Sequence, residues 1–156
     1  MISEVPIHLC HYDSEPHLPV VGGPLFVAYC AYRNGLEGPC RQMIADFLVS
    51  VYESRPAEFS TERFVKEICL ERGIPAPVKR SETPLDILRE AALRRYDRLH
   101  LPVLESILSQ GYRPELGSYL TATEAFGKYL IGDGKNRSSI LAALGEKTIP
   151  RVKVTT

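Results

Sequence analysis

Residues 127–154 read GKYLIGDGKNRSSILAALGEKTIPRVKV, and the pattern of this stretch decides the fold. Residues 129–131 form a short apolar run of side chains that favour β-structure. Residues 138–144 are good helix formers, and Gly145 stands where the cap of a helix C-terminus belongs. Residues 149–154 then alternate again, so the stretch predicts a strand, a polar turn, a helix and a strand.

The polar turn predicts an anion-binding site. A turn that leads from a strand into a helix points free backbone N–H groups and the positive end of the helix dipole at one spot. Arg137 adds a guanidinium group that suits a bidentate contact with phosphate or carboxylate. The residues that we expect to form this anion site are Gly132, Gly134, Lys135, Asn136, Arg137 and Ser138.

This turn does not match the two most common phosphate-binding motifs. Asp133 stands where a Walker A loop requires Lys, and Gly134 stands where it requires Ser or Thr. Arg137 occupies the third Gly position of the dinucleotide fingerprint. The pattern therefore excludes both classes of nucleotide-binding loop.

The composition is that of an ordinary globular chain. With 156 residues, 44% of them hydrophobic, the chain is long enough for one domain with its own core. The formal net charge of zero disfavours a dedicated non-specific nucleic-acid binder. The four cysteines show no CxxC spacing, the N-terminus lacks the basic region of a signal peptide, and no apolar run could span a membrane. We therefore expect reduced, mostly buried thiols, a cytoplasmic location and no membrane partner.

Charge is distributed unevenly between the two ends of the chain. Residues 1–20 contain three acidic side chains and no Lys or Arg, whereas residues 128–153 contain six Lys or Arg and two acids. The two ends could meet at one site, where one would hold a metal ion or a base and the other a phosphate. The alternative is that both are solvated surface.

The opening stretch resembles the ParB/sulfiredoxin-like superfamily. Members carry a Tyr-x-x-x-Asp-Gly-His-His-Arg-like turn, a helix with Ala, and then Leu-Gly and Ile-Pro-Val. An upstream Leu-x-Ser-Ile-x-x-x-Gly pattern matches residues 104–111, and Lys135-Asn136 replaces the usual His-His or Glu-Arg pair. The matching residues of the turn and its flanks are Tyr129, Asp133, Gly134, Arg137, Ala142 or Ala143, Leu144, Gly145, Ile149, Pro150 and Val152.

The resemblance implies an α+β fold: a single domain over 1–156 with a ParB/sulfiredoxin-like core and a small mixed sheet. A helical insertion at about 38–95 would split this core. Helical spacing recurs three times in the insertion, which we expect to be a solvated cap, a cover over the substrate or a homodimer contact.

Three further elements are predicted around the insertion. Residues 4–9 match the short first strand of the family, and residues 25–32 form an apolar run that predicts a buried strand. Pro102 is expected to separate the last helix of the insertion from a helix over 103–110.

The resemblance also implies an activity, because the pattern is nearest to the small-molecule kinases of the family. Such an enzyme would transfer a phosphoryl group from ATP, CTP or another nucleotide to a hydroxyl of a small molecule, with Mg²⁺. Some members place an essential Glu in the segment after the first strand, where Glu15 is the nearest match and Asp13 the second choice for the base. Asp133 would contact Mg²⁺ or the acceptor hydroxyl, or instead cap the following helix. A sulfiredoxin activity is not expected, because the nucleophilic Cys after the turn Gly is replaced by Lys135.

Two other classes of function stay open. One is a ParB-like module that binds CTP and DNA, or a nuclease-type module, and the other is a non-catalytic effector-binding protein. The sequence ends at Thr156, soon after the signature, so we expect no helix-turn-helix domain. Nucleic acid is therefore a possible partner but not the favoured one.

Overall fold

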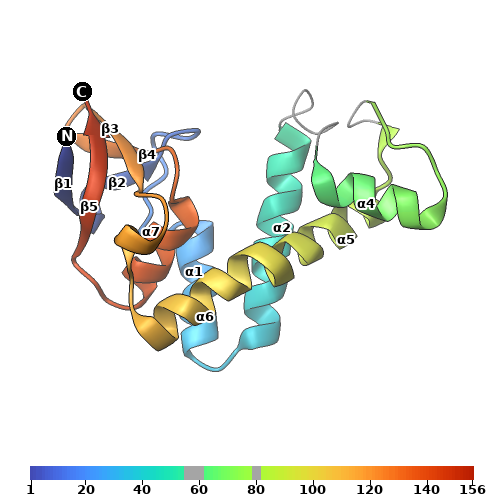
Figure 1. Ribbon diagram of the computed structural model, residues 1–156, viewed down its shortest axis with the longest axis horizontal. Helices are drawn as coiled ribbons and strands as arrows, with labels where there is room; N and C mark the ends of the chain where they lie inside the picture. Colours follow the sequence, from blue (N-terminus) through green and yellow to red (C-terminus); the bar gives the residue numbers. More distant parts are fainter. Residues whose placement is uncertain (55–61, 79–81) are drawn as a thin grey trace.

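The computed structural model describes residues 1–54, 62–78 and 82–156. These residues form an α+β fold with two lobes, which Figure 1 shows side by side. The sheet lobe combines a five-stranded sheet with α1 (Pro24–Arg33), α6 (Leu101–Gln110) and α7 (Lys135–Ala143). The helical lobe consists of α2 (Glu37–Ser54), α4 (Arg63–Arg72) and α5 (Leu85–Arg95).

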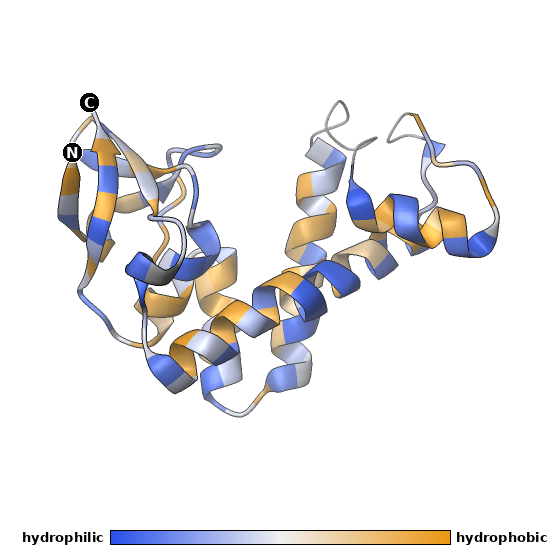
Figure 2. Cartoon of the chain, viewed as in Figure 1, coloured by the Kyte–Doolittle hydropathy of each residue, from blue (hydrophilic) through white to orange (hydrophobic). Residues whose placement is uncertain are grey.

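The sheet is mixed, as the family resemblance implies. Its strands are β1 (Ile2–Pro6), β2 (Cys10–Tyr12), β3 (Thr121–Ala125), β4 (Lys128–Ile131) and β5 (Thr148–Thr155), in the order β1-β5-β3-β4-β2. The β1–β5 and β3–β4 pairs are antiparallel, and the β5–β3 and β4–β2 pairs are parallel. Apolar and polar bands alternate along β1 and β5 in Figure 2, because one face of the sheet packs into the core and the other faces solvent.

The strand-turn-helix-strand prediction for residues 127–154 is confirmed by β4, α7 and β5. Gly145 has a φ of 83° after the last residue of α7. Its N–H donates to Ala142, and the N–H of Glu146 donates to Leu141, which is the bonding pattern of a Schellman cap. The C-terminus of α7 is therefore closed by its own backbone.

The first strand is shorter than predicted. Strand β1 ends at Pro6, and a single 3₁₀ turn, η1 (Ile7–Leu9), follows it. Since β1 and β2 lie at opposite edges of the sheet, the chain has to leave β1 and cross to the other edge at this point.

The predicted strand over residues 25–32 is wrong, because this segment is helix α1. Pro24 occupies the first turn of the helix, where its missing N–H costs no helical bond. Leu25, Ala28 and Tyr29 are buried at helical spacing. The uninterrupted apolar run hides this period, so the sequence pattern alone does not distinguish a buried strand from a buried helix.

The predicted insertion contains α2, α4 and α5 in its described residues. Ile44, Leu48 and Tyr52 are buried at helical spacing on α2, whereas Met43 on the same helix is exposed. On α5, Leu88 and Ala92 are buried, whereas Leu85 is exposed.

The expected break at Pro102 is not present, because one helical path runs from α5 through a π-helical turn, η3 (Tyr96–His100), into α6. Pro102 lies in the first turn of α6. The N–H of Leu101 donates to Tyr96, five residues earlier, so the wider π-turn lets the helix pass the proline.

All four cysteines are free thiols, and Cys10, Cys40 and Cys69 are buried. Burial raises the pKa of Cys10 to about 12, so its thiol stays protonated at neutral pH. In the residues that the structure describes, every helix is too short or too polar to cross a lipid bilayer.

Candidate functional site

The turn between β4 and α7 is held against the start of β3. The N–H of Gly132 donates to the carbonyl of Thr121, and the N–H of Thr121 donates to the carbonyl of Asp133. The Thr121 hydroxyl accepts from the N–H of Asp133 at 3.0 Å. Three bonds to one residue fix the backbone of the turn before any ligand binds.

Gly134 is required at the N-cap of α7. Its φ of 111° lies in the left-handed region, and a Cβ at this position would stand 2.3 Å from Cγ of Leu120. No side chain caps the helix, so the capping role considered for Asp133 is not used. The first N–H groups of α7 have no partner inside the helix and are available to an anion.

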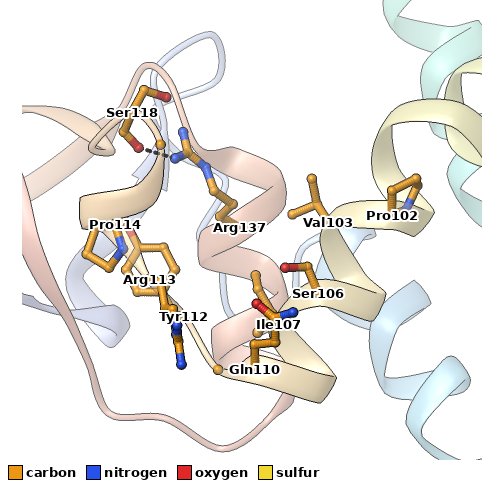
Figure 3. A pocket seen from close by; sticks show the side chains of 12 residues that line it. Pro102, Val103, Ser106, Ile107, Gln110, Tyr112, Arg113, Pro114, Ser118 and Arg137 are labelled. Atoms are coloured by element: carbon orange, nitrogen blue, oxygen red, sulfur yellow. Dashed lines mark hydrogen bonds between the residues drawn. The ribbon is translucent and has the colours of Figure 1, made fainter.

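Arg137 projects from the first turns of α7 into a pocket of about 320 Å³. Its Nη1 donates to the carbonyl of Ser118, and its Nη2 lies 3.4 Å from the Asp133 carboxylate. Figure 3 shows Arg137 between the Ser118 loop and the side chains of Val103 and Ser106 on α6. The guanidinium is thus fixed at one edge and still faces the pocket.

Asp13 and Lys135 meet at the opposite side of the turn. Lys135 Nζ lies 2.6 Å from Asp13 Oδ1 and also donates to the carbonyl of Gly132. The backbone N–H of Asp13 donates to Ile131, which ties the segment after β2 to the end of β4. The sequence left open whether the acidic start and the basic end of the chain meet or are both solvated surface, and they contact each other at this pair.

Glu15 lies in the exposed loop that follows Asp13. Its carboxylate is 3.9 Å from His17 within the same loop, and 58% of its side chain is exposed. Among the described residues, the carboxylate after β2 that contacts the turn is therefore Asp13, the second choice for the base from the sequence.

Asp133 is the carboxylate at the turn that could contribute to a Mg²⁺ site. In the described ranges, no three His, Cys, Asp or Glu side chains gather into a metal site. Mg²⁺ is commonly held by one or two carboxylates while phosphate oxygens and water complete its shell. Asp133 is 64% exposed beside the turn and can supply one such oxygen.

The side chains of Asn136 and Ser138 point away from the expected phosphate position. Asn136 Oδ1 accepts from the hydroxyl of Tyr29 on α1 and contacts Nδ1 of His100 at 3.1 Å. Ser138 is fully buried and donates to the carbonyl of Lys135. The Asn136 side chain joins α7 to α1 and to the π-helical turn, whereas the Ser138 hydroxyl bonds within α7. The backbones of both residues remain part of the helix N-terminus.

His100 is the residue through which the π-helical turn contacts α7. Burial lowers the pKa of His100, the positive charge of Arg95 lowers it further, and the bond with Asn136 opposes this shift. The imidazole is therefore neutral at pH 7, with Nδ1–H as the donor to Asn136.

Several residues of the site were missed from the sequence. Tyr29 and His100 lie 107 and 36 positions from Asn136 in the sequence. Their contacts with Asn136 could therefore not be predicted from a local sequence pattern. Tyr112, whose hydroxyl is buried without a partner among the described residues, also lines the Arg137 pocket. The Gly and Pro residues at 111, 114 and 117 were the only local sign that this loop bends around a cavity.

Comparisons with protein-family models, with curated proteins and with solved structures found no match to this chain.

Proposed function

We propose that this protein is a ParB/sulfiredoxin-like phosphotransferase, which transfers a phosphoryl group from ATP or CTP to a hydroxyl of a small molecule. The pocket between α6 and α7 carries the proposal. The two stretches that resemble the family lie apart in the sequence, yet both line this pocket. The first contributes Ser106, Ile107 and Gly111, and the second contributes Arg137. Because both family-like stretches line one pocket, we take them to be two parts of a single binding site.

The pocket offers the two environments that a nucleotide needs. Its volume of about 320 Å³ falls in the range of small-molecule sites. Val103 and Ile107 give one wall apolar contacts for a nucleoside. The phosphates would lie at the uncapped N-terminus of α7, within reach of Arg137.

The groups around the turn suit phosphoryl transfer, which depends mainly on positioning and on charge stabilisation. Arg137 and the first amides of α7 would stabilise the charge on the transferred group, and Lys135 would add a second cation. Mg²⁺ bound to Asp133 and to nucleotide oxygens would neutralise further charge. Asp13 would accept the proton of the acceptor hydroxyl, because it is the carboxylate that the Lys135 contact holds at the turn.

A turnover assay tests this proposal. The protein is incubated with Mg²⁺ and either ATP or CTP in the presence of a pool of small hydroxylated metabolites, and phosphorylated products are detected by ³¹P NMR. We expect Asp13→Asn to lower kcat by about 10²- to 10⁴-fold, as for loss of a general base. Glu15→Gln, the matched control two residues away, is expected to change kcat by less than about threefold. Absence of turnover with every acceptor and both nucleotides would contradict the proposed activity, and the reverse order of the two variants would contradict the choice of base.

A further inference from the structure

The solvent-facing side of the sheet holds a second pocket, of about 300 Å³. Figure 1 shows α1 and α7 on the opposite side of the sheet, where the core lies. The residues that give this second pocket its chemistry are Asp13, Thr121, Thr123, Leu130, Lys153 and Thr155. We call it the sheet pocket.

The register of three strands gathers hydroxyl groups in the sheet pocket. Thr121 and Thr123 lie on the same face of β3, since side chains two residues apart point to the same side of a strand. Thr123 pairs with Thr155 on β5, and their hydroxyl oxygens are 3.3 Å apart. Leu130, opposite Thr123 on β4, adds one apolar contact. A small polar molecule would thus find several hydrogen-bond donors and acceptors on one surface.

The charges of the sheet pocket favour an anion that also carries a hydroxyl. Lys153 Nζ lies 5.4 Å from the centre of the Tyr119 ring, and it forms no ion pair with any acid in the described ranges. The negative charge of Asp13 is offset by Lys135 at 2.6 Å. Lys153 is therefore the uncompensated charge, while Asp13 still offers carboxylate oxygens to a hydroxyl donor.

The sheet pocket adjoins the phosphate turn. Asp13 and Gly132 line the pocket and also belong to the contacts around Lys135. A Cβ built on Gly132 would lie 3.6 Å from Asp13 Oδ2 and 3.2 Å from the Thr121 hydroxyl, so the absence of a side chain keeps this junction open. Through Asp13, a molecule in the pocket would lie next to Lys135, the first residue of α7.

We infer that the sheet pocket is the acceptor site and that it binds a small hydroxylated anion, with a carboxylate or phosphate group at Lys153 and the hydroxyl at Asp13. This inference rests on the proposed phosphotransferase function. In the step that follows, the hydroxyl proton passes to Asp13 and the hydroxyl oxygen forms a bond to the terminal phosphorus. The bond between that phosphorus and its bridging oxygen breaks, and the nucleoside diphosphate leaves. The acceptor site then lies on the sheet and not on the helical insertion.

Methyl NMR of the full chain tests the acceptor site. The probes are glycerate, glycerol 3-phosphate and glycerol, which share hydroxyl groups and differ in their anionic group. We expect at least one of the two anions to shift the methyl signals of Thr121, Thr123 and Leu130, and to bind tenfold or more tightly than glycerol, which corresponds to about 1.4 kcal/mol. Which anion binds tighter identifies the acidic group. Equal affinity for all three probes, or shifts confined to the helical lobe, would overturn the inference.

Two variants give the test a matched control. Lys153→Gln should remove the advantage of the anion over glycerol, whereas Arg151→Gln, an exposed cation on the same strand outside the pocket, should preserve it. Thr123→Phe should fill the pocket and weaken both anions by tenfold or more, and its methyl spectrum reports whether it is folded. Equal behaviour of the Lys153 and Arg151 variants would overturn the assignment.

Nucleotide binding, measured by thermal shift on the same samples, distinguishes failure of the acceptor site from failure of the proposed phosphotransferase function. A chain that binds nucleotide but neither anion contradicts the acceptor site alone. A chain that binds an anion in the sheet pocket but no nucleotide contradicts the proposed function and supports the pocket.

Discussion

The two lobes use their arginines differently. In the helical lobe and the helical turn that follows it, arginines pair with acids: Arg72 with Asp86 and Glu90, Arg94 with Glu71 and Glu90, Arg95 with Glu62, and Arg98 with Glu67. In the sheet lobe, Arg33 donates to a backbone carbonyl at the end of α7. Arg137 donates to the carbonyl of Ser118 near the start of α7 and has one looser acidic contact, 3.4 Å from the Asp133 carboxylate.

The difference indicates what each lobe does. The arginines of the helical lobe contact carboxylates at 2.6–3.0 Å, so they join neighbouring helices and have little charge left for a ligand. Arg137 contacts a single, 64% exposed carboxylate at 3.4 Å and keeps more of its positive charge. From this difference we expect the helical lobe to act as a structural support and the charge that attracts an anion to lie beside α7. Variants in the two lobes test this division.

The largest effect is expected in the core of the helical lobe. Phe64 is fully buried on α4, and Arg63, Arg95 and Arg98 lie over its ring. Phe64→Ala should lower the free energy of unfolding by about 3–5 kcal/mol. Phe126→Ala, at a side chain that is 97% exposed, should change it by less than about 0.5 kcal/mol. Urea unfolding measures both.

Nucleotide affinity of the folded Phe64 variant sharpens the comparison. If the helical lobe is a support, the nucleotide Kd of the Phe64→Ala variant should stay within about threefold of the Kd of the unchanged protein. A loss of more than tenfold in a folded sample would show that the helical lobe takes part in binding. Should Phe64→Ala fail to fold, Phe64→Leu serves the same purpose with a smaller cavity.

A smaller effect is expected at the start of α7. Gly134→Ala should cost about 1 kcal/mol for its positive φ and a further 1–3 kcal/mol for the contact with Leu120. Gly35→Ala is the matched control, because Gly35 also has a positive φ but has no atom within 4 Å of a built Cβ. The difference between the two unfolding free energies isolates the contact with Leu120. Equal losses would show that the turn does not require this close approach.

The smallest effect is a pH dependence that originates at His100. Because the pKa of His100 is lowered in the folded state from its ordinary value of 6.5, the unfolded state takes up the proton first. The free energy of unfolding should therefore fall as the pH drops from 7.5 through 6.5 toward the lower folded pKa. The slope from this one group is at most about 1.4 kcal/mol per pH unit. Urea midpoints at pH 7.5, 6.5 and 5.5 measure this slope.

Two histidine variants check the origin of the slope. His100→Gln should reduce it, and His17→Gln, at an exposed side chain, should preserve it. The pKa of His11 is also lowered by burial, so some dependence should persist in both variants. An unchanged slope in His100→Gln would place the proton uptake elsewhere.

Much of the fold could be predicted from local sequence patterns. Residues 127–154 were predicted correctly because the hydrophobic period changes twice there and glycines mark the changes. For residues 25–32 the same approach failed, because every position is apolar or aromatic and no period shows. At Pro102 the sequence suggested a break, but a proline in the first turn of a helix is tolerated after a π-helical turn.

The candidate site depended more on long-range contacts. The charge asymmetry suggested that residues 1–20 and 128–153 meet, but only the fold selects Asp13 over Glu15. Asn136 looked like a phosphate ligand because it lies in the turn, yet its side chain accepts a hydrogen bond from Tyr29 on α1. The sheet pocket follows from strand register, which sequence pattern leaves open.

Isothermal titration of ATP and CTP into Arg137→Ala and Arg33→Ala tests the central claim most directly. Each variant removes one guanidinium that donates to a backbone carbonyl beside α7, at opposite ends of the helix. We predict that Arg137→Ala raises the nucleotide Kd by about 10- to 100-fold, as expected for loss of a hydrogen bond to a charged group, while Arg33→Ala stays within about threefold. Unchanged affinity in Arg137→Ala, or an equal loss in Arg33→Ala, would contradict a phosphate site at the start of α7.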